Sequence, residues 1–158
     1  MLSTTSEHAI RALVFLAKIP QGESVLGRDL SSIAEVPSNY LAKILVQLNR
    51  QGMLEATRGR GGGYRLSRPA EDIRLIEVVT ALEGEAAIPQ CILEHSRICS
   101  DENPCAAHPD WKHVRNTYIR FLNDTTIARI ASNLEEDDVE KLLARLKTLE
   151  SVEPKHQA

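Results

Sequence analysis

The three cysteines of this chain lie close together and are followed by a histidine. Cys91, Cys99, Cys105 and His108 form the pattern C-x7-C-x5-C-x2-H. Thiolates and imidazoles are soft ligands, and they are the donors that proteins use for zinc and for iron–sulfur clusters. The segment therefore predicts a metal or iron–sulfur site.

Two other interpretations of these cysteines stay open. Cysteine packs well as a small hydrophobe, but the nearby Glu94, Asp101 and Glu102 would make a poor core. Three thiolates and one histidine also suit a closed tetrahedral zinc site. The spacing lacks the paired C-x2-C motif of zinc modules, which favours a cluster. A count of three also argues against a disulfide framework.

The elements before the cysteines follow a DNA-binding pattern. Apolar periodicity predicts helices over residues 6–19, 27–35 and 38–49. Thr4 and Glu7 match a capping box for the first helix, and Ser38 is the expected N-cap of the third. The second and third helices, joined by a tight turn at Pro37, form a predicted helix-turn-helix.

A glycine-rich hairpin is expected to follow these helices. Strands are predicted over 53–57 and 64–67, and the intervening RGRGGG segment supplies glycines for a tight turn and arginines that can enter a minor groove. A helix-turn-helix followed by such a hairpin is a winged helix, so the fold class is mainly α with a small β-wing. The predicted DNA contacts are Arg28, Ser38, Asn39, Tyr40, Lys43, Arg58 and Arg60.

Four segments are expected along the chain. Residues 1–84 form the DNA-binding domain with its wing at 53–68, and 85–108 form the cysteine loop. Residues 109–132 form a long helix with an apolar stripe, followed by a short helix that is capped at 125–126. Residues 133–158 form an amphipathic helix and a tail. The apolar stripe of the long helix includes Val114, Tyr118, Phe121 and Leu122.

Charge and composition fit a DNA-binding protein that works in the cytoplasm. The net charge is −3, but residues 1–70 carry nine Lys/Arg against five Asp/Glu, whereas residues 71–158 carry ten against seventeen. A basic N-terminal half is typical of a nucleic-acid contact. No signal peptide and no membrane-spanning apolar run is expected. A nucleotide loop and a catalytic Ser/His/Asp arrangement are also missing from the sequence, so an enzyme is not expected.

The chain resembles the bacterial Rrf-two family of winged-helix transcriptional regulators over residues 1 to about 132. The resemblance is carried by residues 5–13 (TSEHAIRAL), 40–45 (YLAKIL), 58–66 (RGRGGGYRL), the three cysteines and 125–128 (TTIA). It implies a homodimer held by the long helix after the cysteine loop, so Val114, Tyr118, Phe121 and Leu122 become the expected dimer residues. It also implies binding to partly palindromic, double-stranded promoter DNA.

In IscR-like and NsrR-like members, three cysteines and one further ligand hold a [2Fe–2S] or [4Fe–4S] cluster. The resemblance places the further ligand at His108 or, alternatively, at Glu7 from the partner subunit. The resemblance favours a [2Fe–2S] cluster over a [4Fe–4S] cluster. Protein purified in the apo form would lack the cluster. This chain departs from the family pattern in its longer first cysteine spacing and in His8, where an aromatic residue is usual.

The protein is expected to be a dimeric transcriptional regulator that acts as a repressor. An iron–sulfur cluster that senses redox state, nitric oxide, or iron and cluster status would control its binding to promoters. The alternative is a winged-helix repressor without a cluster, controlled by thiol oxidation, zinc or a protein partner.

Overall fold

The computed structural model describes residues 2–20, 22–59, 62–84, 87–88, 91, 93, 99–134, 144 and 148. These residues form six α-helices, one 3₁₀ helix and one two-stranded sheet. The elements are α1 (Thr4–Leu16), α2 (Gly27–Ala34), α3 (Ser38–Arg50), β1 (Leu54–Thr57), β2 (Gly63–Leu66), η1 (Ala70–Asp72), α4 (Leu75–Glu83), α5 (His108–Asp124) and α6 (Ile127–Ser132). The mainly helical fold with a small β-wing is confirmed.

Helix α1 begins earlier than predicted because Ser3 is its N-cap. The Ser3 hydroxyl accepts a hydrogen bond from the Ser6 backbone N–H at 3.2 Å. The predicted capping box of Thr4 and Glu7 is wrong, since the backbone N–H of Glu7 donates to the Ser3 carbonyl within the helix, at 3.0 Å. A run of small hydroxyl residues offers several equivalent caps, and the tertiary contacts of Ser3 select one of them.

A buried hydroxyl network fixes the turn between α2 and α3. Glu35 adopts the left-handed conformation at φ 56° and ends α2. The Ser31 hydroxyl then donates to the Val36 carbonyl at 2.6 Å and lies 2.8 Å from the Ser38 hydroxyl. Ser38 is therefore the first residue of α3 and not its N-cap, which is Pro37. These contacts fix the angle between α2 and α3.

The wing is an antiparallel pair that is attached to the start of α2. Leu54 pairs with Leu66, and Thr57 pairs with Gly63 at the tip. Val25 extends this sheet, because its backbone exchanges hydrogen bonds with Tyr64 at 2.9 and 2.8 Å. Gly63 has φ +149°, and a Cβ placed there would lie 2.5 Å from the Val25 carbonyl oxygen. The close approach between wing and α2 thus requires glycine.

Helix α1 lies at the centre of the fold and contacts α2, α3, α4 and α6. Its buried face packs against the inward residues of these helices, and the largest fully buried side chains include Leu13, Leu30, Leu41, Leu48 and Ile73. The predicted cap of the short helix α6 is confirmed, since Thr126 Oγ1 accepts from the Arg129 N–H at 3.2 Å.

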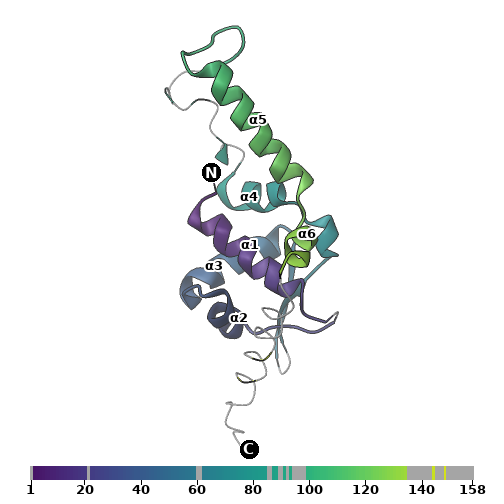
Figure 1. Cartoon of the computed structure of the whole chain (residues 1–158). Coiled ribbons are helices and arrows are strands. Elements are labelled where there is room, and N and C mark those ends of the chain that lie inside the picture. The colour runs from purple at the N-terminus through teal and green to yellow at the C-terminus, as the bar shows by residue number, and fades with distance from the viewer. Residues whose placement is uncertain are drawn as a thin grey trace, which may run out of the picture.

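Helix α5 projects from this body as a single arm (Figure 1). Its C-terminal end is fixed by two backbone hydrogen bonds, from Leu75 N to Thr125 O at 3.0 Å and from Ile127 N to Ile73 O at 2.9 Å. Its N-terminal end, which begins at His108, lies at the far tip (Figure 1). The amphipathic helix predicted within 133–158 falls mainly outside the described residues. No helix in the described part of the chain is long and apolar enough to span a membrane.

Candidate functional site

The structure brings the three cysteine sulfurs together at the tip of α5. All three lie within 4.8 Å of one another, and Sγ of Cys91 is 3.4 Å from Sγ of Cys105. Cys91 and Cys99 are buried and Cys105 is half-buried, and none of them forms a disulfide. Three sulfurs that come together from positions 91, 99 and 105 make a soft ligand set.

His108 stands beside this set as the first residue of α5. Its Nδ1 lies 3.0 Å from Sγ of Cys99, and its Nε2 lies 2.9 Å from Oδ1 of Asp101. Metal-binding histidines commonly donate their second ring N–H to a carboxylate, which fixes the tautomer. With Nε2–H donated to Asp101, the lone pair of Nδ1 faces Cys99.

Lys112 forms an ion pair with Asp101, the carboxylate that contacts His108. Its Nζ lies 2.7 and 2.6 Å from the two Asp101 carboxylate oxygens, one turn along α5 from His108. The hydrogen bonds from Lys112 and then from His108 hold the pKa of Asp101 below its ordinary value of 3.8. Asp101 is therefore ionised at neutral pH and can orient the imidazole.

The Cys105 thiol retains its proton in the absence of a cation. The hydrogen bond with Cys91 and, next, burial raise the pKa of the Cys105 thiol above its ordinary value of 9.0. Binding of a metal or cluster must therefore displace protons, as at other thiolate sites. The donor set of three sulfurs beside an oriented imidazole fits either a cluster or zinc.

Glu7 is not part of this ligand set within one chain. It lies on the exposed side of the first turn of α1. The group of mutually close ligand atoms among the described residues consists of the three cysteine sulfurs. Figure 1 shows the separation, since α1 begins in the body of the molecule, whereas residues 99–107 lead into α5 at its outer tip.

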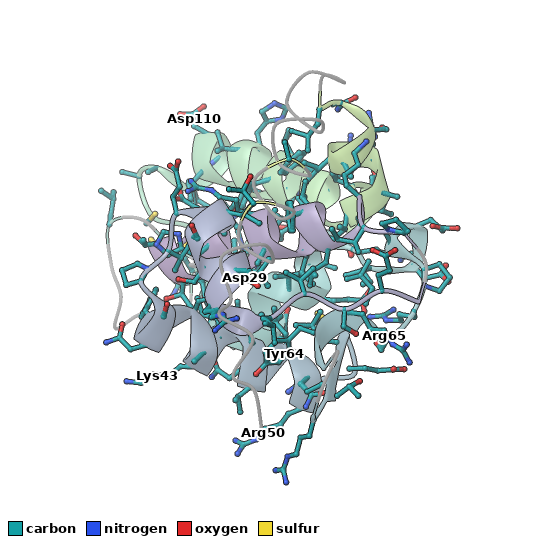
Figure 2. The ribbon with its side chains drawn as sticks, turned by 90° about the horizontal axis from the view of Figure 1, so that it is seen from below. Asp29, Lys43, Arg50, Tyr64, Arg65 and Asp110 are labelled. Carbon is teal, nitrogen blue, oxygen red and sulfur yellow. The ribbon has the colours of Figure 1, made fainter. Side chains whose placement is uncertain are left out.

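The predicted DNA-binding residues fall on α2, α3 and the wing. Asn39 and Lys43 are exposed on α3, and Arg58 is exposed at the end of β1. Arg28 is exposed on α2, with its Nε 3.5 Å from Asp29 Oδ1. Figure 2 shows Lys43 on the outer side of the body as seen from below. Arg60 lies outside the described residues.

Two of the predicted DNA contacts are tied into the fold. The Tyr40 hydroxyl is hydrogen-bonded to the Thr5 hydroxyl, and the Tyr40 ring meets the His8 ring edge-on at 5.7 Å between centroids. The Ser38 hydroxyl is bonded to Ser31. These contacts link the start of α3 to α1 and α2, so both residues also position the helix.

The apolar stripe of α5 divides into an exposed part and a buried part. Val114 is 54% exposed and Phe121 is 49% exposed. The Tyr118 ring stacks on Phe121 with centroids 6.4 Å apart. Leu122 is fully buried in the core of the chain itself. Of the four residues predicted for the dimer, three therefore have surface that a second copy can cover.

One polar cluster was not predicted from the sequence. Glu83, at the end of α4, accepts hydrogen bonds through Oε1 from the Ser3 N–H at 3.2 Å, from the Ser3 hydroxyl at 2.6 Å and from the Ser6 hydroxyl. The charge of Glu83 also acts on Tyr118, whose pKa is raised by burial and then by this carboxylate. The cluster joins the start of α1 to the end of α4 beside α5.

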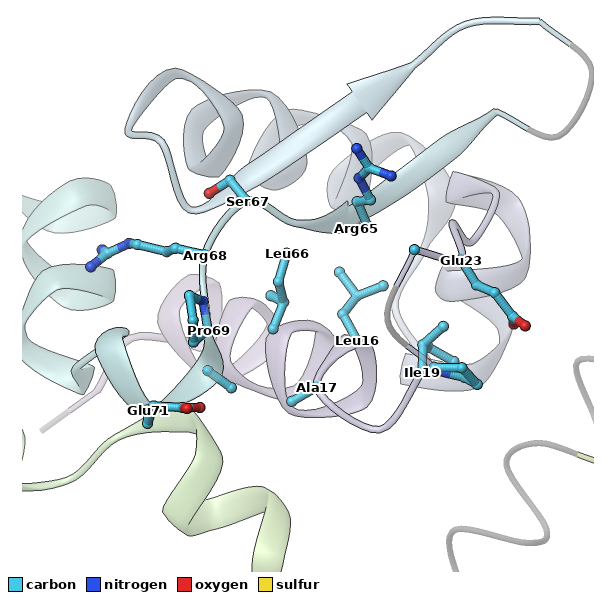
Figure 3. A pocket seen from close by; sticks show the side chains of 13 residues that line it. Leu16, Ala17, Ile19, Glu23, Arg65, Leu66, Ser67, Arg68, Pro69 and Glu71 are labelled. Atoms are coloured by element: carbon cyan, nitrogen blue, oxygen red, sulfur yellow. The ribbon is translucent and has the colours of Figure 1, made fainter.

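A surface pocket of about 460 Å³ lies where the end of α1 meets β2 and η1 (Figure 3). Leu16, Ala17 and Leu66 line its apolar side. Its two arginines are already bonded to carboxylates, Arg65 to Glu55 at 2.7 Å and Arg68 to Glu77. Because these charges are balanced within the chain, we assign no anion to the pocket.

Comparison with known proteins agrees with the architecture. A family model described as "Rrf2: Iron-dependent Transcriptional regulator" matches residues 2–133. The chain is 32% identical over 146 residues to the HTH-type transcriptional regulator NsrR of Bacillus subtilis (strain 168), covering 90% of this chain and 96% of that protein.

Solved structures share the fold at lower identity. CymR (YrzC), the global cysteine regulator of B. subtilis, superposes with a TM-score of 0.71 at 21% identity and covers 85% of this chain and 98% of its own. IscR of T. potens gives a TM-score of 0.68 at 21% identity, covering 87% of this chain and 90% of its own. The chain therefore belongs to the Rrf2 (Rrf-two) family of winged-helix transcriptional regulators, which bind DNA and are not enzymes.

Proposed function

We propose that the protein is a dimeric repressor whose affinity for promoter DNA is set by an iron–sulfur centre on Cys91, Cys99 and Cys105. The observation that carries this proposal is the gathering of three sulfurs within 4.8 Å, beside an imidazole that a carboxylate orients. An incidental group of cysteines has no need of an oriented histidine.

His108 is our choice for the fourth ligand, with Glu7 of a second copy as the alternative. The contact of Nδ1 with Cys99 favours His108 within one chain. A mixed cysteine and histidine set favours [2Fe–2S] over [4Fe–4S], since histidine ligation is well known for two-iron centres. When bound, the cluster supplies a redox-active group that oxygen and nitric oxide can attack.

The residues of the chain connect this site with the DNA-reading elements. The cysteine sulfurs and His108 join the loop to the first turn of α5. At its other end, residues 125–127, which follow α5, are held to residues 73–75 at the start of α4 by the backbone bonds at Leu75 and Ile127. Val114, Tyr118 and Phe121 offer the surface for a second copy between these ends.

Control of DNA binding follows from that arrangement. An ordered loop fixes how two α5 arms pack, and this sets the separation of the two α3 helices. Two half-sites lie about 34 Å apart along the DNA, and both must be met together. Release of the loop therefore lowers affinity without any change in α3 itself. The segments proposed for these roles are 1–84 for DNA, 85–108 for the cluster and 109–132 for the dimer.

A second candidate function is a regulator controlled by thiol oxidation, zinc or a protein partner. It is favoured by the 3.4 Å separation of the Cys91 and Cys105 sulfurs, which a disulfide could bridge after a small movement. The same winged helix and the same dimer surface would serve this function.

Purification without oxygen separates the two candidates. We expect a coloured protein with bound iron and sulfide, which Cys91→Ala and Cys105→Ala abolish. Protein that lacks iron after reconstitution, but forms a Cys91–Cys105 disulfide on oxidation, would support the second candidate. DNA binding is tested in parallel by selection from random sequence. Arg58→Ala should lower the slope of log affinity against log salt by about one, as expected for a lost phosphate contact.

A further inference from the structure

The outer face of α3 carries apolar surface that the fold does not use. The buried side of the helix consists of Leu41, Ile44, Leu45 and Leu48. On the opposite side, Ala42 and Val46 follow one another at one helical turn, and both are exposed. The exposed fraction of Val46 is 43%.

Valine is an unfavourable choice for this position on grounds of folding alone. A β-branched side chain loses χ1 freedom in a helix, and an exposed one gains no burial in return. Single exposed apolar residues are common on protein surfaces. Val46, however, adjoins Ala42 on the same face of a helix whose contacts with α1, α2, α4 and β1 leave that face outward.

The surroundings of Val46 indicate what covers it. Lys43 and Arg50 lie on the exposed side of α3, and the whole helix contains no carboxylate. Figure 2 shows Lys43 and Arg50 on the outer side of the body. A protein partner that covered Val46 would not need this excess of positive charge on α3, whereas binding to the phosphates of DNA does need it.

Base pairs present apolar surface in the major groove at one place only, the 5-methyl group of thymine. We propose that Val46 contacts a thymine methyl group in each half-site, and that the small side chain of Ala42 leaves room for that methyl to approach. The inference rests on the proposed role of α3 as the DNA-reading helix and names the base that it selects.

The rest of the outer face agrees with this preference. Asn39 precedes the apolar pair along α3 and Gln47 follows it, and both are exposed. Side-chain amides pair with the N6 and N7 of adenine. Because α3 has no carboxylate, it has no acceptor of the kind that reads the cytosine amino group. A·T pairs are therefore expected at the positions that face Asn39, Val46 and Gln47.

The experiment removes the two sides of this contact separately, the thymine methyl group and the side chain of Val46. A half-site pair obtained by selection is made with deoxyuridine in place of each thymine in turn, and dissociation constants are measured for the full-length dimer and for Val46→Ala. At one symmetric position, the wild type should bind the uridine site about threefold to fivefold more weakly, as expected for one lost methyl contact. Val46→Ala should bind the thymine and uridine sites equally.

Lys43→Ala is the matched control on the same face. It removes a charge, so it should weaken binding to both sites by a similar factor and keep the preference for thymine. Indifference of the wild type to every thymine-to-uridine change would overturn the inference while leaving the proposed function intact. A preference that persists unchanged in Val46→Ala would overturn the assignment to Val46. Failure of the wild type to bind any selected DNA would instead overturn the proposed function.

Discussion

Nδ1 of His108 lies 3.0 Å from Sγ of Cys99, at the point where the cysteine segment becomes helix α5. This contact joins the candidate metal centre to the long helix that we propose as the dimer element. It depends on the orientation of the imidazole, and Asp101 sets that orientation from the other side of the ring.

Loss of Asp101 should therefore weaken metal retention without removing a ligand. We expect Asp101→Ala to lose bound iron about 10-fold to 100-fold more readily to a chelator, the usual scale for the loss of a group that orients a ligand. Glu102→Ala is the control, because it removes the neighbouring exposed carboxylate. Equal iron retention by the two variants would show that Asp101 does not orient the ligand.

Glu83 should make the stability of the metal-free protein depend on pH. Burial raises the pKa of Glu83, but the hydrogen bonds from Ser3 and Ser6 outweigh it and hold the pKa below its ordinary value of 4.5. Below that value the unfolded chain binds more protons than the folded one. The contribution of Glu83 is therefore complete above pH 4.5 and is lost as the pH falls through the lower folded pKa.

Urea denaturation between pH 3 and pH 7 measures this effect. The free energy of unfolding of the wild type should exceed that of Glu83→Gln at neutral pH, and the difference should shrink below about pH 4.5. Glu71→Gln, an exposed carboxylate on η1, should show no such convergence. A difference between wild type and Glu83→Gln that is constant with pH would contradict the assignment.

Gly63 should tolerate no side chain. In Gly63→Ala, the new Cβ would lie 2.5 Å from the Val25 carbonyl oxygen at φ +149°, so the wing must separate from the start of α2. We expect a loss of about 2–3 kcal/mol in the free energy of unfolding. Gly59→Ala has φ +96° with open space around it and should cost less. A Gly63→Ala variant as stable as Gly59→Ala would exclude the close contact.

The winged helix could be predicted from the sequence because its signals are local. The buried stripe of α3 repeats at helical spacing, and the glycine-rich segment marks the wing. The cap of α1 could not be predicted in this way. Ser3 is selected over Thr4 through its bond with Glu83, which lies 80 residues away in the chain.

The candidate site shows the same division. The three cysteines and His108 were identified from residue type and spacing alone. The sequence identifies Asp101 only as an acid near the cysteines. Its contact with Nε2 of His108 could not be predicted, because no spacing rule pairs a loop carboxylate with a histidine nitrogen. Leu122 was assigned to the dimer with its neighbours Tyr118 and Phe121, but a helical stripe does not distinguish the chain's own core from a partner's surface. The structure places Leu122 in the core.

The exposed part of α5 should be required for self-association. Val114→Asp places a charge on apolar surface that a second copy would cover, and we expect the variant to sediment as a monomer while the wild type sediments as a dimer. Asn116→Asp adds the same charge on a different side of α5 and should leave the mass unchanged. A Val114→Asp variant that remains dimeric would place the interface elsewhere.

The most direct test of the account is the affinity of the protein for its selected promoter DNA with and without the metal centre. The measurement uses fluorescence anisotropy without oxygen, at one fixed salt concentration, on iron-loaded protein and on the same preparation after chelation. We predict that the two forms differ in dissociation constant at least about tenfold, about 1.4 kcal/mol, and that Cys105→Ala behaves as the chelated form under both conditions. Identical affinities for the two wild-type forms would contradict control of DNA binding by the site at Cys91, Cys99 and Cys105.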